Sequence, residues 1–281
     1  MLNMQSVDTL IDFAFSEDIG VGDITTEATV SSEQKAIGTL HAKSEGIVAG
    51  LPVAERVFSR LDSDLTFTIF VCDGDSILAG APIAEVQGNA KTILIGERTA
   101  LNFMQRLSGV ATLTSQFVKA VAGYDVKIVD TRKTTPGWRA LEKYAVRVGG
   151  GNNHRFGLYD GVLIKDNHII AAGGISNAVQ CAKKAAPHTA KIEVEVESIE
   201  QVNEALEAGA DILLLDNMSI ETMEQVVKLI DNRVITEASG GITLERVQDV
   251  ASTGIDYISV GALTHSAMPL DISLTLRHSG T

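Results

Sequence analysis

One short stretch of the chain concentrates side chains that bind anions. Between Lys127 and His168 the sequence has eight basic and four acidic residues, which gives this window a formal charge of +4. The whole chain carries −13, which leaves −17 for the rest. Because the positive charge is confined to one segment, its target should be compact as well. We therefore predict a site for a small, highly charged anion, and the acidic remainder argues against a nucleic-acid partner.

The cations of this stretch offer two complementary ways of binding an anion. Arginine pairs with planar carboxylates and phosphates through two parallel hydrogen bonds, whereas lysine acts as a point charge. Together they suit a ligand with several carboxylates or phosphates. The candidate residues are Arg132, Lys133, His154, Arg155 and Lys165. For any one of them the alternative of a surface ion pair with Glu142, Asp160 or Asp166 stays open.

Glycine-containing segments could present backbone N–H groups to the same anion. The candidates are Gly149–Gly151; Ser239, Gly240 and Gly241; and Gly261 with His265. The first allows a close approach of the backbone, because glycine has no side chain. The second is expected between a strand and a helix beginning near Thr243, which is typical of a phosphate site at a helix N-terminus. The third follows the last expected strand, where α/β barrels commonly complete such a site. Plain turns could use the same glycines.

Two carboxylates are expected at the ends of neighbouring strands. Burial of an unpaired carboxylate is costly, so Glu195 and Asp216 each need a cation, a metal ion or a polar ligand. Glu193, Glu195 and Glu197 alternate and therefore share one face of their strand, which we expect to be the polar interior or mouth of a barrel. We predict that Glu195 and Asp216 are site residues; the alternative is structural ion pairing.

The elements that must position these residues alternate regularly after about Val126. Short apolar strands are expected at 126–129, 162–164, 192–196, 212–215, 234–237 and 257–260. Amphipathic helices are expected at 175–186, 199–208, 219–230 and 243–252. Repeated β-then-α units indicate a parallel sheet covered by helices, either open or closed. Polar residues follow almost every strand, which favours a barrel with its chemistry at the carboxyl ends of the strands.

The first hundred residues have a different pattern. Helices are expected at 6–15, 52–61 and 93–107, and strands at 36–43, 65–71 and 82–87. Elements of both kinds without strict alternation indicate an α+β unit.

Composition limits the class of protein. A chain of 281 residues with 45% hydrophobic residues can form one large domain or two. Cys72 and Cys181 lie far apart and outside metal-ligand spacing, so we expect buried or incidental thiols of a reducing compartment. The N-terminus is unlike a signal peptide, and no apolar run approaches the ~20 residues that cross a bilayer. We predict a cytoplasmic protein without a membrane partner.

Several segments, in order, resemble the quinolinate phosphoribosyltransferase family. They are EDIGVGDITT, GERTALNFMQRLSGVATLT, DTRKTTPGWRALEKYAVRVGGGNNHR, GLYDGVLIKDNHI, IEVEVES, LLLDNM, EASGGI and YISVGALTHSAMPLDISL. The resemblance covers nearly the whole chain and depends on the number and order of motifs rather than on any one of them. Trp138 and Val148 are mild departures from the pattern that should not alter the chemistry.

The resemblance implies an architecture and an assembly. The expected fold is an N-terminal α/β sandwich (1–102) followed by an incomplete, seven-stranded α/β barrel (103–268), with a C-terminal segment (269–281) that returns to the N-terminal domain. It also implies a homodimer, or a higher oligomer, in which Arg98 reaches the active site of the partner subunit.

The resemblance further implies a reaction. Quinolinate and phosphoribosyl pyrophosphate, with Mg²⁺, would give nicotinate mononucleotide, pyrophosphate and CO₂ in NAD biosynthesis. The carboxylates of quinolinate are expected at Arg132, His154, Arg155, Lys165 and the partner's Arg98. Lys133 and Lys165 are expected near the pyrophosphoryl group, and Ser239, Gly240, Gly241, Gly261 and His265 near the ribose phosphate. Lys133, Lys165, Glu195 and Asp216 form the expected catalytic set. Glu195 and Asp216 would stabilise the positive charge on the ribose, or hold Mg²⁺ and the ribose hydroxyls.

Other functions compete with this one. The chain could be a paralogue on the same fold, such as the protein found beside molybdate transporters, or another pyridine phosphoribosyltransferase. It could also be a barrel that binds a ligand without catalysis, but carboxylates in a site for anions argue against simple binding.

Overall fold

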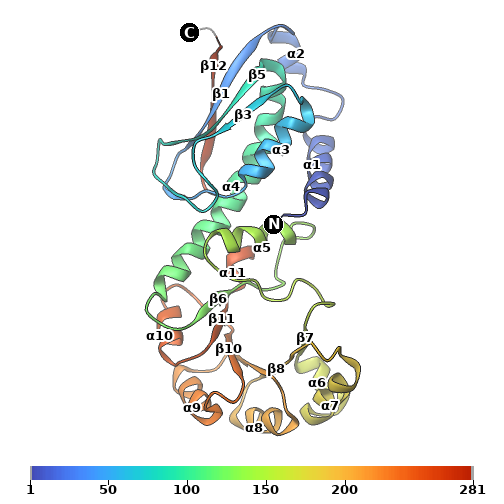
Figure 1. Cartoon of the computed structure of the whole chain (residues 1–281), viewed down its shortest axis with the longest axis vertical. Helices are drawn as coiled ribbons and strands as arrows, with labels where there is room; N and C mark the ends of the chain where they lie inside the picture. Colours follow the sequence, from blue (N-terminus) through green and yellow to red (C-terminus); the bar gives the residue numbers. More distant parts are fainter. Residues whose placement is uncertain (1, 280–281) are drawn as a thin grey trace. The chain divides into compact units, whose positions relative to one another are not determined.

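The computed structural model describes residues 2–279, which form two compact units (Figure 1). The first unit contains the residues up to Ser115, Thr135–Gly150 and the residues from Thr264 on. The second contains Gln116–Thr134 and Gly151–Leu263. No helix within residues 2–279 combines the length and the apolar character needed to cross a membrane.

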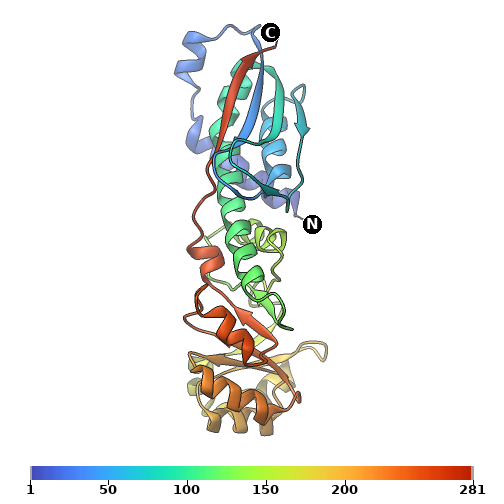
Figure 2. The same cartoon turned by 90° about the vertical axis from the view of Figure 1, so that its left-hand side faces the viewer.

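The first unit is built on a four-stranded antiparallel sheet with the order β12-β1-β5-β3. Its strands are β1 (Lys35–Ala42), β3 (Thr66–Ile69), β5 (Pro82–Asn89) and β12 (Ile272–His278). The expected strands β1, β3 and β5 are confirmed, whereas β12 was not expected as a strand. It pairs with β1, for example Leu274 opposite Leu40, and the two strands lie side by side in both views (Figure 2). A short ribbon joins β2 (Gly46–Ile47) to β4 (Ser76–Ile77).

The three helices expected in the first hundred residues are confirmed as α1, α3 and α4. The helices of this unit are α1 (Met4–Asp18), α2 (Ile24–Thr29), α3 (Leu51–Leu61), α4 (Ala90–Ala120) and α5 (Arg139–Val148), of which α2 and α5 were not expected. Phe58 of α3, Ile83 of β5 and Ile93 of α4 are almost fully buried and form part of the core. The helix expected at 93–107 is longer at both ends, because buried apolar residues such as Val110 and Phe117 continue its pattern.

The second unit contains a six-stranded parallel sheet with the order β6-β11-β10-β9-β8-β7. Its strands are β6 (Lys127–Val129), β7 (Val162–Ile164), β8 (Ile192–Val196), β9 (Ile212–Asp216), β10 (Ile235–Ser239) and β11 (Tyr257–Ser259). All six expected strands are confirmed to within about two residues. Its helices are α6 (Asp166–Ala172), α7 (Ile175–Ala185), α8 (Ile199–Ala208), α9 (Ile220–Ile230) and α10 (Val247–Ser252), followed by α11 (Ala262–His265), which ends in the first unit.

The barrel is incomplete, as expected, but within residues 2–279 its sheet has six strands where seven were expected. Strands β6 and β7 are the two edges of the sheet and do not pair with each other. A further extended segment lies beside β6, where Asn152 forms an isolated parallel bridge with Val129. The backbone of Asn152 donates to Ile128 O at 2.8 Å and accepts from Asp130 N at 3.2 Å. This segment places the residues that follow it, His154 and Arg155, at the same end as the carboxyl ends of the strands.

Local sequence signals explain where the helices of this unit begin and end. Ser198 and Ser219 precede α8 and α9, and their hydroxyl oxygens accept backbone N–H groups from Gln201 and Thr222. Helix α8 ends at Gly209, whose φ of 80° is easily adopted only by glycine. The helices therefore start and stop where the βα repeat requires, and each strand returns to the same end of the sheet.

Candidate active site

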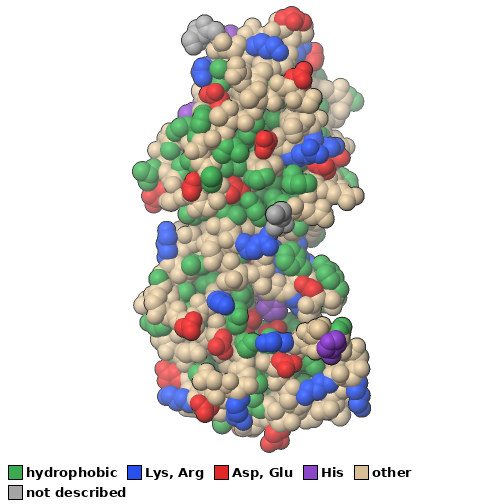
Figure 3. Space-filling view, in the orientation of Figure 1, with side chains coloured by type: hydrophobic (Ala, Val, Ile, Leu, Met, Phe, Trp, Pro, Cys, Tyr) green, Lys and Arg blue, Asp and Glu red, His purple; other side chains and the backbone are tan. Residues whose placement is uncertain are grey.

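A cavity of about 400 Å³ lies at the carboxyl ends of the strands of the second unit. Its lining includes Thr131, Arg132, Lys133, His154, Arg155, Lys165, Glu195, Asp216, Asn217, Glu237, Ser239, Gly240, Gly241 and Ser259. The structure thus brings together all the predicted cations of the 127–168 window, both predicted carboxylates and the Ser239–Gly241 segment. Figure 3 shows basic, acidic and histidine side chains gathered around a hollow in this unit.

Chain topology explains why these residues meet. Arg132 and Lys133 follow β6, Lys165 directly follows β7, and Asp216 is the last residue of β9. Parallel strands of a barrel end on one side, so side chains just past each strand converge there.

Asp130 organises the loop that carries His154. This carboxylate is fully buried at the end of β6 and accepts hydrogen bonds from the backbone N–H of His154 at 2.9 Å and from Nδ2 of Asn153 at 2.6 Å. A buried carboxylate needs such donors to offset its lost hydration. The loop after Asn152 is therefore tied directly to the barrel interior.

The charged form of Arg155 is disfavoured by its surroundings. Its Nη1 donates to Gly161 O at 2.9 Å. Burial lowers the pKa of Arg155 below its ordinary value, and the nearby charge of Arg132 lowers it further, while Glu193 and Asp160 oppose this shift. Two cations brought together and partly removed from water favour an anionic ligand, because the ligand offsets both effects.

An ion pair between residues of neighbouring strands is part of the cavity lining. Nζ of Lys165 lies 2.5 Å from Oε2 of Glu195, with the lysine about half exposed and the glutamate 11% exposed. Asp216 accepts from Nδ2 of its neighbour Asn217 at 2.7 Å. The two carboxylates thus lie in the same cavity as the cations, as predicted, and their oxygens are the ligand type that Mg²⁺ prefers.

The Ser239–Gly241 segment can approach a ligand only because it contains glycine. Gly240 and Gly241 have φ values of 90° and 59°. A side chain at Gly240 would overlap the side-chain oxygen of Asn217. The expected helix starts later than predicted: α10 begins at Val247 rather than near Thr243, because turns occupy the residues between. Any phosphate contact would therefore come from the loop itself and not from a helix N-terminus.

Three predicted site residues are not part of this lining. Gly261 follows β11 in the second unit. Arg98 is an exposed residue of α4, and both it and His265 belong to the first unit. Their predicted roles stay predictions.

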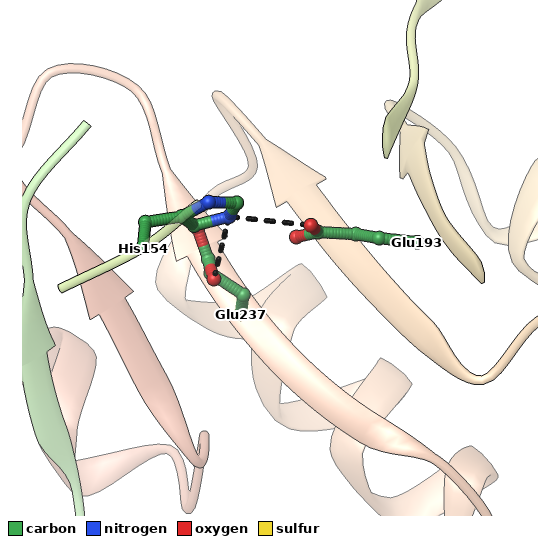
Figure 4. A group of neighbouring side chains, drawn as sticks. All are labelled: His154, Glu193 and Glu237. Atoms are coloured by element: carbon green, nitrogen blue, oxygen red, sulfur yellow. Dashed lines mark ion pairs between the residues drawn. The ribbon is translucent and has the colours of Figure 1, made fainter. Parts of the chain in front are cut away.

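Two buried acids were not singled out as site residues: Glu237, which lines this cavity, and Glu193, which lines an adjoining one. Nε2 of His154 lies 3.2 Å from Oε2 of Glu193 and 3.6 Å from Oε2 of Glu237, so that both carboxylates face the same ring nitrogen (Figure 4). Burial, and then the charge of Glu193, raise the pKa of Glu237 to about 7. A glutamate within an apolar strand was the available signal, the same one that pointed to Glu195. Glu197, expected on the same face, lies beyond the end of β8 and is exposed.

The fold and the cavity define a class: an α/β-barrel protein with a cationic site that also holds carboxylates. Comparison with known proteins makes the class specific. The chain matches the N-terminal domain of quinolinate phosphoribosyl transferase over residues 23–108 and its C-terminal domain over residues 110–275. The chain belongs to the quinolinate phosphoribosyltransferase family.

Similar proteins and solved structures support the same family. The chain is 49% identical to a probable nicotinate-nucleotide pyrophosphorylase (carboxylating) of Bacillus subtilis, over 97% of this chain and 94% of that protein. It is 43% identical to a mitochondrial quinolinate phosphoribosyltransferase (decarboxylating) of Nicotiana glauca, over 95% and 81%. The crystal structure of NadC from Streptococcus pyogenes superposes with a TM-score of 0.95 at 43% identity, covering 99% of both chains. The nicotinate-nucleotide pyrophosphorylase of Francisella tularensis also gives 0.95, at 41% identity, over 99% and 98%.

Proposed function

We propose that the cavity of the second unit is the active site at which this phosphoribosyltransferase joins quinolinate to the phosphoribosyl group of phosphoribosyl pyrophosphate. The products are nicotinate mononucleotide, pyrophosphate and CO₂, a step of NAD biosynthesis. One observation carries the proposal: a single cavity at the carboxyl ends of barrel strands combines a cluster of cations with Glu195 and Asp216.

The cations divide between the two substrates. We assign the two carboxylates of quinolinate to Arg132, Arg155 and Lys165, with His154 beside them. The lowered pKa of Arg155 supports this assignment, because a dianion would relieve the repulsion from Arg132.

The phosphates of the second substrate require separate contacts. We assign the pyrophosphoryl group to Lys133 and Lys165. The 5′-phosphate of the ribose is assigned to the loop of Ser239, Gly240 and Gly241, together with Gly261 and His265. The positive φ values of this loop support a close approach of its backbone to an anion.

Glu195 and Asp216 act on the charge that develops during the transfer. When the bond to pyrophosphate breaks, positive charge forms on the ribose ring, and carboxylates fixed beside it stabilise that charge. The same oxygens fit Mg²⁺, which would neutralise pyrophosphate charge when bound. After the ring nitrogen has attacked, the cationic pyridinium accepts the electrons of the breaking C–CO₂ bond. The carbon then takes a proton, and no dedicated base is needed to start the step.

The assembly and the location are further parts of the proposal. We infer a homodimer, or a higher oligomer, in which Arg98 of one subunit completes the quinolinate site of its partner. We also infer a cytoplasmic location. Cys72 and Cys181 are free and exposed rather than buried, which is compatible with a reducing compartment.

Product analysis tests the activity. The purified protein is incubated with quinolinate, phosphoribosyl pyrophosphate and Mg²⁺, and we expect nicotinate mononucleotide together with an equal amount of CO₂. With nicotinate in place of quinolinate we expect no product. Turnover of nicotinate without CO₂ release would instead identify another pyridine phosphoribosyltransferase, and absence of turnover with either would favour a binding protein.

A further inference from the structure

Two buried glutamates line a second cavity that shares residues with the candidate active site. Glu193 lies on β8 and Glu237 on β10, the two strands that flank β9. Both line a cavity of about 320 Å³ whose other lining residues include the first residues of several strands. His154, Arg155 and Glu237 line this cavity and the candidate active site alike.

Each glutamate directs one oxygen to His154 and leaves the other unused. The Oε2 atoms lie 3.2 Å (Glu193) and 3.6 Å (Glu237) from Nε2 of His154. Within residues 2–279, neither Oε1 atom has a hydrogen-bond partner. Burial of such oxygens is unfavourable, and a role in placing the imidazole explains why they are there.

The hydrogen bonds of His154 define where its proton sits. The backbone N–H of Arg155 donates to Nδ1 of His154 at 2.7 Å, so Nδ1 carries a lone pair. A neutral imidazole then carries its proton on Nε2, which points between the two carboxylates (Figure 4). The three groups are close enough to hold a metal ion, with ligand atoms within 4.8 Å of one another. A protonated Nε2 cannot ligate a metal, so the geometry favours hydrogen bonding instead.

The imidazole connects the glutamates to Arg155. Its Nε2 lies next to the carboxylates, and its Nδ1 accepts a hydrogen bond from the backbone N–H of Arg155. A ring that is fixed at both nitrogens fixes the turn between residues 154 and 155 as well.

We propose that Glu193 and Glu237 are positioning residues for quinolinate, which act through His154 to hold the backbone of Arg155 so that its guanidinium faces the ligand. This inference rests on the proposed function of the cavity. It assigns no contact between the glutamates and either substrate.

Methionine and glutamine variants separate hydrogen bonding from space filling, because both side chains have nearly the volume of glutamate. In Glu193→Met the nearer acceptor is lost, and we expect KM for quinolinate to rise about tenfold. KM for phosphoribosyl pyrophosphate should stay within about twofold. Glu193→Gln keeps an acceptor oxygen and should restore KM for quinolinate to within about threefold of wild type. The same ranking is expected for Glu237. Glu224→Met, at an exposed position on α9, is the control.

Equal effects of methionine and glutamine, or a rise in both KM values together, would overturn the proposal.

Nitrogen-15 NMR of the wild-type histidines is an independent test that does not require a variant to fold. We expect His154 to be protonated at Nε2, and a proton on Nδ1 would overturn the proposal. Metal analysis adds another check, because one bound ion per chain that is lost in Glu193→Gln would make the cluster a metal site. Inactive wild-type protein would count against the proposed function. Active wild-type protein, with variants whose KM for quinolinate is unchanged, would count against this inference alone.

Discussion

Asp216 shows how one carboxylate can serve either binding or turnover. It ends β9 in the lining of the cavity, and its Oδ2 accepts a hydrogen bond from Asn217. Asp216→Asn keeps the shape and removes the charge. If the carboxylate acts mainly on the developing ribosyl cation, kcat should fall about 100-fold while both KM values stay within about threefold. Steady-state kinetics check this, with the exposed Asp249→Asn as a control. Weakened substrate binding at unchanged kcat would make Asp216 a binding residue.

Glu237 predicts a pH dependence of stability. Its pKa is raised to about 7 in the fold by burial, and the facing groups Glu193, His154, Ser259 and Asp130 modify it. From about pH 5 upward the unfolded chain has largely released this proton while the folded chain keeps it. The unfolded state therefore binds fewer protons, and the free energy of unfolding falls as pH rises toward about 7.

Glu237→Gln removes this dependence. From about pH 5 to about pH 8, we expect the variant to gain on the order of 1–3 kcal/mol of unfolding free energy relative to wild type. Urea unfolding at the two pH values measures the difference. Parallel curves for the two proteins would show that Glu237 titrates as an ordinary carboxyl.

At the scale of elements, the sequence predicts what depends on apolar periodicity. All six barrel strands follow from short apolar runs, and α1 and α3 follow from the spacing of their apolar residues. It predicts less well where an element begins or ends: α4 is longer than expected and α10 shorter. Strand β12 carries exposed and half-buried residues, and its pairing with β1 involves a partner more than 200 residues away. Such long-range pairing leaves no local signal.

The residues of the site were also predictable only where a local sequence pattern marks them. Residue types and their place after strands predicted most of the cavity lining, because barrel topology brings strand ends together. The approach of His154 Nε2 to both Glu193 and Glu237 could not be predicted. It depends on the segment at Asn152, which pairs through one isolated bridge and has no strand-like pattern. Side-chain hydrogen bonds across a barrel are set by packing and not by spacing along the chain.

The Ser239–Gly241 loop gives a test of an element. Gly240→Ala introduces a side chain at a φ of 90°, where it would overlap Asn217. Gly123→Ala is a matched control, because Gly123 has a φ of 100° but no atom within 4 Å of the added carbon. Both variants bear backbone strain of about 1–2 kcal/mol. We expect only Gly240→Ala to raise KM for phosphoribosyl pyrophosphate, by about tenfold or more. Equal KM values for phosphoribosyl pyrophosphate in both variants would show that this loop does not contact the phosphate of the substrate.

At the scale of the whole molecule, subunit mixing tests the proposed shared site. Arg98→Ala and Lys165→Ala homodimers should both be nearly inactive, because every site lacks one required cation. In a mixed dimer one site carries both defects and the other carries neither. Random reassortment makes half of the dimers mixed, so activity should recover to about a quarter of wild type if sites act independently.

Mass spectrometry establishes whether subunits exchange. Exchange without any recovery of activity would place Arg98 in the site of its own subunit or outside any site. Recovery of activity without detectable subunit exchange would indicate contamination by wild-type enzyme.

Calorimetric titration with quinolinate tests most directly the claim that the barrel cavity is its binding site. Arg132→Ala and Arg155→Ala each remove a cation at the rim of the cavity, and Lys184→Ala removes an exposed cation of α7 as a control. We predict that each arginine variant loses about 2–5 kcal/mol of binding free energy while keeping the thermal stability of wild type, and that the lysine variant binds normally. Quinolinate affinity within about threefold of wild type in both arginine variants would contradict the account.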